Sequence, residues 1–299
     1  MAATWRDLVD PTLEELVDGL PVAVEPETLE ALVAPPGDGR SLRPRIESHG
    51  AYVLAVLATP VSRTAEDRVD YLEVDAVATM DAIVTIRRTG PGGATADVSV
   101  LAAAPAGASV GALVHLLVDD VADTYLDLLD TLYGEVDELE DHVERLAGLV
   151  VRRRLVELRH ELLHARRTIS ATRAAVRRIV DRRCELSTGE LFPHRIEAAF
   201  ADTYDTLVRA TEDLDVAREL VGGVRDFHQA KVTESQNDTA KTLTVIASLV
   251  LVPSLIVGFY GQNFESAFTS DLWTLGVSSS LILASTLVQL VLYRWRRWI

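Results

Sequence analysis

A chain of 299 residues with a formal net charge of −16 lacks the basic footprint that a general nucleic-acid-binding protein needs. Its single cysteine, Cys184, excludes an internal disulfide and a thiolate metal cluster, so we expect a structural thiol. The acidic, lysine-poor composition is typical both of high-salt adaptation and of a domain that handles cations, and composition does not distinguish the two.

Residues 1–110 have the mixed pattern of an α/β domain with a sheet of several strands. The first ten residues contain no apolar run, so we expect no signal peptide and a chain that begins in the cytoplasm. A proline at the start and acids in the first turn predict short helices at Pro11–Leu20 and Pro26–Val33. Enrichment in Val, Ile, Tyr and Thr predicts strands at Tyr52–Val61, Val69–Thr79, Ala82–Arg87 and Ala96–Leu101.

From Val110 onward the pattern is helical. Residues 110–149 have an apolar face with helical spacing and an opposite face that is acidic from Asp119 to Glu144. A second helix, at about Val151–Arg183, is rich in arginine. From about Arg195 no proline occurs until Pro253, which predicts a helix of about 65 residues and roughly 100 Å. That length suits a stalk better than an element of a globular core.

Two segments near the C-terminus have no charged side chain, Thr242–Phe264 and Leu272–Tyr293. Each is long enough to cross a bilayer as a helix, which takes about 20 apolar residues. Lys241 precedes the first segment and Arg294, Arg296 and Arg297 follow the second, whereas the loop between them carries Glu265 and Asp271. Because basic residues flank the cytoplasmic ends of spans, we expect both termini inside the cell and the loop outside.

The first span ends in Tyr260-Gly-Gln-Asn-Phe264, ahead of a second span and a basic tail. This ending resembles the CorA-type divalent-cation channels, whose signature at this place is Tyr-Gly-Met-Asn. The segments Trp5-Arg-Asp-Leu, Arg43-Pro-Arg-Ile-Glu and Phe200-Ala-Asp-Thr-Tyr-Asp also look like parts of that family. Gln262 departs from the pattern, because the family has methionine there.

The resemblance implies a homopentameric funnel with an α/β/α cytosolic domain, a stalk helix that continues into the pore-lining span, and an outer second span. The corresponding divisions are a cytosolic α/β domain at 1–110, helical arms at 111–190, the stalk at 191–241, spans at 242–264 and 272–293, an external loop at 265–271 and a basic tail at 294–299. Closed cyclic symmetry around a pore is the expected assembly.

Five copies of the segment Tyr260–Asn263, with Gly261 and Gln262, would form the selectivity mouth. Mg²⁺ gives up its water reluctantly, so neutral oxygens of Asn263 and of a glycine-containing turn can hold the hydrated ion without trapping it. Glu265 and Asp271 in the loop would raise the local cation concentration. Gln262, in place of the family's methionine, keeps the identity of the divalent ion open.

The resemblance also assigns roles to residues along the stalk and first span. Pore-lining positions fall on Asn237, Leu243, Ala247 and Leu251, whose spacings of 6, 4 and 4 are read as one helical face. Asp202 matches the stalk acid of a cytosolic regulatory Mg²⁺ site, with Glu66 or Asp67 as the candidate partner from a neighbouring subunit. A basic ring of Arg294, Arg296 and Arg297 would face the acidic helix. The alternative is that these leucines only pack between helices and the acids are solvated.

His160-Glu-Leu-Leu-His164 matches the H-E-x-x-H pattern of zinc proteases. Arg159, Arg166 and Arg167 surround it with positive charge, which disfavours Zn²⁺, so we do not expect an enzyme.

The sequence therefore predicts a pentameric channel for Mg²⁺ and Co²⁺ uptake across the cell membrane, closed by cytosolic Mg²⁺. Its partners are other copies of itself, the lipid bilayer and divalent cations, with no organic cofactor and no nucleic acid. Membrane potential drives a divalent ion inward, and no P-loop motif for ATP occurs. Two alternatives stay open: a carrier of zinc or another transition metal, prompted by Gln262, and a membrane-anchored cation sensor that does not conduct.

Overall fold

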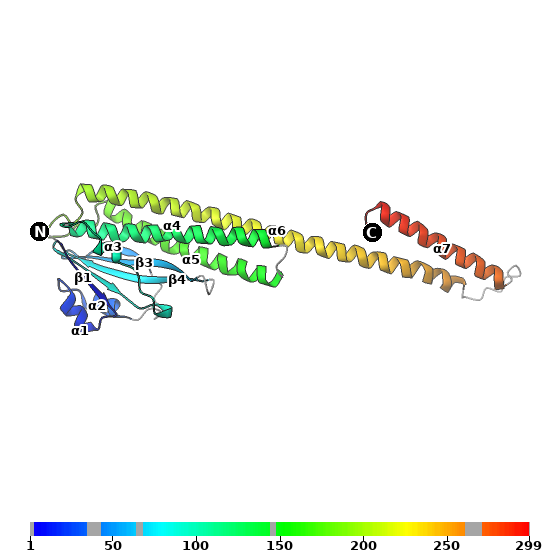
Figure 1. Ribbon diagram of the computed structural model, residues 1–299, viewed down its shortest axis with the longest axis horizontal. Coiled ribbons are helices and arrows are strands. Elements are labelled where there is room, and N and C mark those ends of the chain that lie inside the picture. Colours follow the sequence, from blue (N-terminus) through cyan, green and yellow to red (C-terminus); the bar gives the residue numbers. More distant parts are fainter. Residues whose placement is uncertain (1–2, 35–42, 64–67, 144–147, 261–270, 299) are drawn as a thin grey trace. The chain divides into compact units, whose positions relative to one another are not determined.

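The computed structural model describes residues 3–34, 43–63, 68–143, 148–260 and 271–298. The chain divides into two compact units, residues 1–225 and 226–299. The division falls inside the long helix α6 (His194–Tyr260), which therefore contributes to both units (Figure 1).

The first unit is built on a five-stranded mixed sheet in the order β1-β5-β4-β3-β2. β1 runs parallel to β5, and the other neighbouring strands are antiparallel. The strands are β1 (Thr4–Val9), β2 (Arg45–Ser48), β3 (Val53–Arg63), β4 (Arg68–Ala78) and β5 (Ala82–Arg87). The three central strands confirm the predicted ones, whereas β1 and β2, at the two edges, were not predicted from composition.

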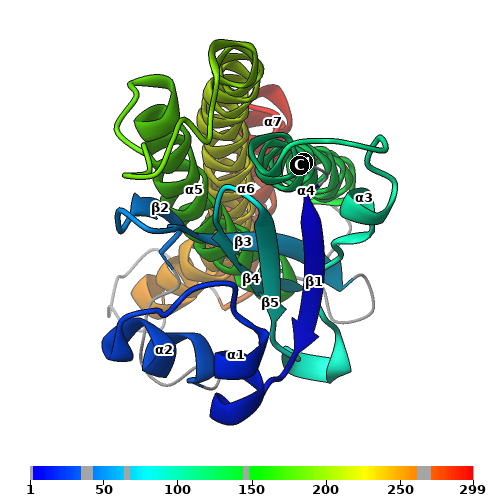
Figure 2. The same cartoon turned by 90° about the vertical axis from the view of Figure 1, so that its left-hand side faces the viewer.

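Helices cover both faces of this sheet. Figure 2 shows α1 (Leu13–Gly19) and α2 (Pro26–Val33) on one face. The other face carries α3 (Ser99–Ala102), α4 (Val110–His142), α5 (Gly148–Val180) and the first part of α6. Separate apolar clusters fill the two sides, since alternate residues of each strand point to opposite faces. The predicted α/β class and its α/β/α layering are confirmed.

A buried ion pair joins α2 to the sheet. Arg88, which directly follows β5, donates to the carbonyl oxygens of Ala31 and Leu32 at 2.9 Å. Its guanidinium also pairs with Asp75 at 3.0 Å and with Glu73 at 3.2 Å. The Asp75 side chain is only 2% exposed, so its charge depends on Arg88 for compensation.

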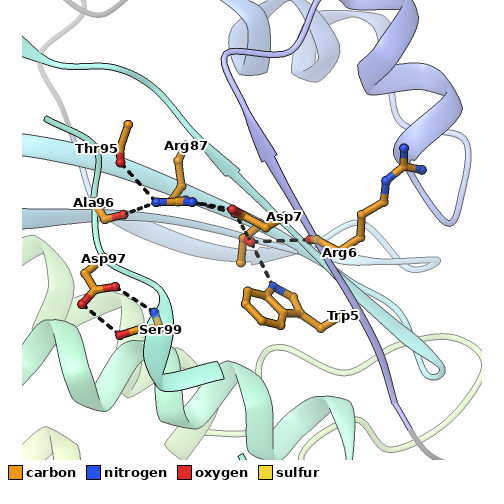
Figure 3. Close-up of polar contacts among 9 residues, drawn as sticks. Trp5, Arg6, Asp7, Arg87, Thr95, Ala96, Asp97 and Ser99 are labelled. Carbon is orange, nitrogen blue, oxygen red and sulfur yellow. Dashed lines mark hydrogen bonds and ion pairs between the residues drawn. The ribbon is translucent and has the colours of Figure 1, made fainter. Parts of the chain in front are cut away.

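The segment predicted as a strand at Ala96–Leu101 is not a strand, and that prediction is wrong. Figure 3 shows the reason: the Asp97 carboxylate accepts hydrogen bonds of 2.9 Å from the backbone N–H and the hydroxyl of Ser99, which starts the short helix α3. Arg87 fixes the approach to this turn by donating to the Ala96 carbonyl at 2.7 Å. Local side-chain hydrogen bonds of this kind compete with sheet pairing.

Arg87 also holds the edge strand β1. Its guanidinium binds both carboxylate oxygens of Asp7, at 3.0 and 2.5 Å (Figure 3). The Trp5 indole N–H donates to Thr85 at 3.1 Å, on the same pair of strands. The Arg87–Asp7 contact is bidentate, and both contacts join residues far apart in the sequence. They add side-chain bonds to the six-residue edge strand β1.

Two tyrosines hold α4 in place, the buried Tyr125 and the half-buried Tyr133. Tyr125 donates its hydroxyl to the Ala58 carbonyl of β3 at 2.7 Å, and Tyr133 donates to the Asp213 carbonyl of α6 at 2.5 Å. The sheet, α4 and α6 are thereby joined side by side, with the outer face of α4 left to solvent. The predicted long helices are confirmed, and α6 is 67 residues long.

Candidate functional site

The second unit contains two long apolar helices, the end of α6 and α7 (Asp271–Trp295). Among the described residues, these two helices have the length and composition to cross a membrane, and their apolar windows are almost entirely unburied by the rest of the chain. Trp273 and Trp295 are highly exposed near the two ends of α7, as expected for anchors at the membrane interface.

One side of the first span faces α7. Val245 is 7% exposed, and Ser248, Leu249 and Val252 are half-buried, at the 3- and 4-residue spacing of one helical face. The hydroxyls of Ser248 and Tyr293 are 2.5 Å apart, which joins the two helices by a hydrogen bond.

This bond gives a prediction for the span pair. Tyr293→Phe removes the interhelical bond while keeping the ring, so it should lower the stability of the helix pair by about 0.6 to 1.7 kcal/mol. Unfolding of the full-length protein in detergent measures the loss. Ser254→Ala is the control, because among the described residues the Ser254 hydroxyl bonds to the Val250 carbonyl of its own helix and not to α7. Equal losses in both variants would remove the interhelical bond as the cause.

The predicted pore-lining residues of the span lie away from Val245. Leu243 is 62% exposed and Leu251 is 67% exposed, and Ala247 between them is also exposed. A stripe with 4-residue spacing that is exposed among the described residues is available to a pore or to neighbouring copies. Asn237 is exposed too, but at 3.6 residues per turn it projects about 120° around α6 from Leu243. The four positions therefore do not form one strict stripe.

The selectivity mouth falls mainly outside the described residues. Gly261, Gln262, Asn263 and Glu265 are not described, Tyr260 is the last residue of α6, and Asp271 begins α7. Arg294, in the last turn of α7, and Arg296 and Arg297 beyond it are all exposed at the other end of the span.

The predicted regulatory acid, Asp202, is exposed on the part of α6 that packs in the first unit. Its neighbour Thr203 is 1% exposed and donates its hydroxyl to Asp119 of α4 at 2.6 Å, with His115 at 3.2 Å. The structure therefore brings Asp202 near the start of the acidic face of α4. Glu66 and Asp67, the predicted partners of Asp202, lie outside the described residues.

The sequence signal for this junction was incomplete. Asp119 was visible as the first acid of a helical face, but His115 was not singled out, although it stands one turn before Asp119. Among the described residues, no group of three His, Cys, Asp or Glu side chains is close enough to hold a metal ion within one chain. A divalent ion at Asp202 would thus need ligands from elsewhere.

Carboxylates on α4 lie close enough to one another to shift each other's pKa. Partial burial, followed by the nearby carboxylates of Asp97 and Asp123, raises the pKa of Asp120. Partial burial, then Asp119 and Asp127, raises the pKa of Asp123. Like charges that raise each other's pKa indicate a surface that favours cations or basic partners.

The H-E-x-x-H pattern lies on α5 and serves packing. The His164 ring lies 4.3 Å from the Tyr71 ring, between centroids, and Glu161 pairs with Arg154 at 3.8 Å. His160 is exposed. Cys184 is buried, and its thiol lies 3.7 Å from the Ile46 carbonyl, as expected for a structural residue.

A layered α/β unit that continues through one helix into two membrane-spanning helices defines a class of integral membrane proteins with a large extramembrane domain. The chain belongs to the family of CorA-like Mg²⁺ transporter proteins, whose sequence model matches residues 4–296. The resemblance seen in the sequence is thereby confirmed, and this family consists of transporters rather than enzymes.

Individual relatives agree with this assignment. The chain is 26% identical over 190 residues to the cobalt/magnesium transport protein CorA of Thermotoga maritima, covering 62% of this chain and 52% of the relative. It is 28% identical over 180 residues to the putative metal ion transporter YfjQ of Bacillus subtilis, covering 60% and 54%. The chain thus spans about half the length of the curated relatives it matches.

Solved structures share the fold. The complete CorA magnesium transporter from Methanocaldococcus jannaschii matches 99% of this chain and 91% of its own, with a TM-score of 0.80 at 19% identity. The cytoplasmic domain of ZntB from Vibrio parahaemolyticus matches 78% of this chain and 90% of its own, with a TM-score of 0.57 at 15% identity.

Proposed function

We propose that this chain forms a channel for divalent cations that carries Mg²⁺, with Co²⁺ as a second ion, into the cell. The observation that carries the proposal is the family match over residues 4–296, which includes both spans and not only the α/β unit. A doubly charged ion gains about 4.6 kcal/mol per 100 mV of inside-negative potential, so uptake needs no ATP site.

The channel is a ring of five copies, with the first span of each around the pore. The exposed stripe of Leu243, Ala247 and Leu251 supports this arrangement. Rings of Leu243 and Leu251 would form apolar constrictions that gate by dewetting. Asn237, rotated about the helix from that stripe, would contribute a polar ring at the cytosolic entrance.

The protein lies in the cell membrane with both termini in the cytoplasm. The basic residues Arg294, Arg296 and Arg297 at the end of α7 support this orientation. The residues between the spans, with Glu265 and Asp271, then form an external mouth that attracts cations. Gly261, Gln262 and Asn263 contact the hydrated ion there, through neutral oxygens that bind without trapping it.

Internal Mg²⁺ closes the channel by binding at Asp202. The junction of Thr203, Asp119 and His115 supports this, because it holds Asp202 beside the acidic face of α4 in a fixed position. A partner subunit supplies the remaining ligands, with Glu66 or Asp67 as candidates.

Asp202→Ala should weaken this closure. Loss of one carboxylate ligand raises the internal Mg²⁺ concentration that halves the flux by about tenfold, the change that about 1.4 kcal/mol produces. Flux into vesicles preloaded with graded Mg²⁺ measures the shift. Glu219→Ala is the control, since Glu219 is exposed on the same helix about 25 Å further along. Unchanged inhibition in Asp202→Ala would exclude Asp202 from the regulatory site.

Gln262 is the observation that keeps a zinc carrier as the second candidate, since it replaces the methionine of the family signature. Parallel uptake assays of Mg²⁺, Co²⁺ and Zn²⁺ by the purified protein separate the candidates. Mg²⁺ uptake that exceeds Zn²⁺ uptake supports the main proposal. Zn²⁺ uptake without Mg²⁺ uptake supports the second, and binding without flux of any divalent ion supports a sensor.

A further inference from the structure

The outer face of α4 carries a regular stripe of aspartates. These residues recur with spacings of three and four along the helix, and the stripe consists of Asp120, Asp123, Asp127, Asp130, Asp137 and Asp141. Gly134 occupies the one position of this series that lacks an acid. The pattern extends over about 32 Å at 1.5 Å per residue. All six are exposed except Asp120, which is half-buried.

A basic stripe of the same length lies on α5. Its members recur every seven residues and are Arg152, Arg159, Arg166 and Arg173, flanked by Arg153, His160 and Arg167. The alternating spacings of three and four in the aspartate stripe also add up to a repeat of seven residues. Seven residues rise about 10.5 Å in either helix, so the two stripes repeat at the same distance. In a chain of net charge −16, this concentration of arginine on one helix is the main local exception to the acidic surface.

The two stripes do not neutralise each other within one chain. Across the described residues, the six stripe aspartates have no ion pair, and neither do Arg152, Arg159 and Arg173; Arg166 pairs with Asp215 of α6 at 3.0 Å. Among the described residues, an intrachain ion pair between α4 and α5 is formed by Glu135 and Arg154, which belong to neither stripe. Figure 2 shows α4 and α5 on either side of α6, so the two helices that carry the stripes are on different sides of the stalk helix.

We propose that the arginine stripe of α5 docks on the aspartate stripe of α4 of a neighbouring copy of this chain. The interface is head-to-tail, because each copy offers an acidic flank to one neighbour and a basic flank to the other. Such an interface closes into a ring when successive copies are related by rotation without a shift along the axis. The inference rests on the ring assembly of the proposed function and names the contact between its cytosolic domains.

The two stripes lie at similar distances from the tip of the α4–α5 hairpin, as a ring formed by rotation without a shift along the axis requires. α4 and α5 are antiparallel arms of one helical hairpin, and both stripes start a few residues from its tip, at Asp141 and Arg152. Rotation of a copy therefore brings the two stripes to the same level within about one helical turn, 5.4 Å. With Asp141 of one copy opposite Arg152 of its neighbour, Asp127 is opposite Arg166 and Asp120 is opposite Arg173. Arg159 is then opposite Gly134, between Asp130 and Asp137.

Electrostatic complementarity of this kind selects partner and register more than it adds affinity. Single exposed ion pairs contribute little, but several in register form a network, and like charges directly opposed are strongly unfavourable. The interface is consequently sensitive to salt, because exposed pairs are screened over a Debye length of about 10 Å at 0.1 M ionic strength.

Cysteine cross-linking of the full-length protein tests the contact. The variant Asp127→Cys with Arg166→Cys, treated with a short bismaleimide, should give a ladder of covalent oligomers on a denaturing gel, whereas either single variant should not. A link within one chain leaves the monomer band. The native Cys184 is buried and should not react under folded conditions. A monomer band alone, from protein whose native mass is that of a ring, would overturn the inference and leave the proposed function standing.

Exchange of the charges between the two stripes is the second test of this contact. In the double-cysteine background, Arg152→Glu with Arg159→Glu should slow cross-linking at least about tenfold. Adding Asp137→Arg with Asp141→Arg to that chain should restore the rate, because opposite charges again face each other. Cross-linking that is indifferent to the first pair, or that the second pair does not restore, contradicts the inference. A monomeric native mass of the unmodified protein would contradict the ring itself.

Discussion

Mg²⁺ uptake through the Asn263→Ala protein should fall at least about tenfold, the largest functional effect that we expect from one substitution. A hydrogen bond to a charged or ion-bound group contributes about 1.5–3 kcal/mol, and a ring of five copies loses this contact at every subunit. Alanine also removes the only side-chain amide of the mouth other than Gln262. Uptake by vesicles under an inside-negative potential measures the effect.

The control for Asn263→Ala is Ser280→Ala. Ser280 lies on α7, and within the described part of the chain its hydroxyl bonds to the Gly276 carbonyl of its own helix, so the flux should be unchanged. Gln262→Met, which restores the family signature, should keep Mg²⁺ uptake. Wild-type flux in Asn263→Ala, with the protein still assembled, would remove Asn263 from the ion pathway.

The largest effect on stability should follow from Arg88→Met. This change leaves the buried Asp75 without its counter-charge and removes the hydrogen bonds to Ala31 and Leu32 that hold α2. Breaking one side of a buried ion pair costs about 3–5 kcal/mol of the free energy of unfolding. Denaturant titration of the full-length protein, followed by circular dichroism, measures the loss.

The pH dependence of this loss has a definite sign. Burial, and then the neighbouring Glu73 carboxylate, raises the pKa of Asp75 well above its usual range. The folded state therefore binds more protons than the unfolded state above about pH 4, so stability falls as pH rises through the raised pKa. Without Arg88, which lowers the pKa of Asp75, that pKa rises further, and the destabilisation should grow as pH rises.

The matched control is the double variant Arg88→Met with Asp75→Asn. It removes both charges, so it should be more stable than Arg88→Met alone, and its stability should depend less on pH. If the double variant is no more stable than the single one, the uncompensated charge of Asp75 is not the source of the loss.

The central strands were predictable because β3, β4 and β5 are rich in β-branched residues and bury one or both faces. The edge strands were not, for different reasons. β2 has four residues, too few for a period, and β1 is held by side-chain contacts from Asp7 and Trp5 to β5 that composition does not reveal. At Ala96–Leu101 the composition favoured a strand, but the carboxylate of Asp97 starts a helix instead.

Some parts of the candidate site could be predicted from the sequence and others could not. The spans follow from hydropathy alone, and the structure confirms two apolar helices there. The contacts beside Asp202 could not be predicted from the sequence, because Thr203 and His115 meet only when α4 and α6 pack together. Asn237 shows the opposite failure, since counting residues suggested one face where helical geometry gives an offset of about 120°. Site residues that depend on neighbouring copies, including the mouth and the partner of Asp202, stay predictions.

Voltage-driven uptake of Mg²⁺ by the purified wild-type protein in lipid vesicles is the decisive measurement for a divalent-cation channel. We expect uptake that increases with inside-negative potential, needs no ATP and declines as internal Mg²⁺ rises. No flux of any divalent cation at any potential, from protein that is correctly inserted and assembled, would contradict it.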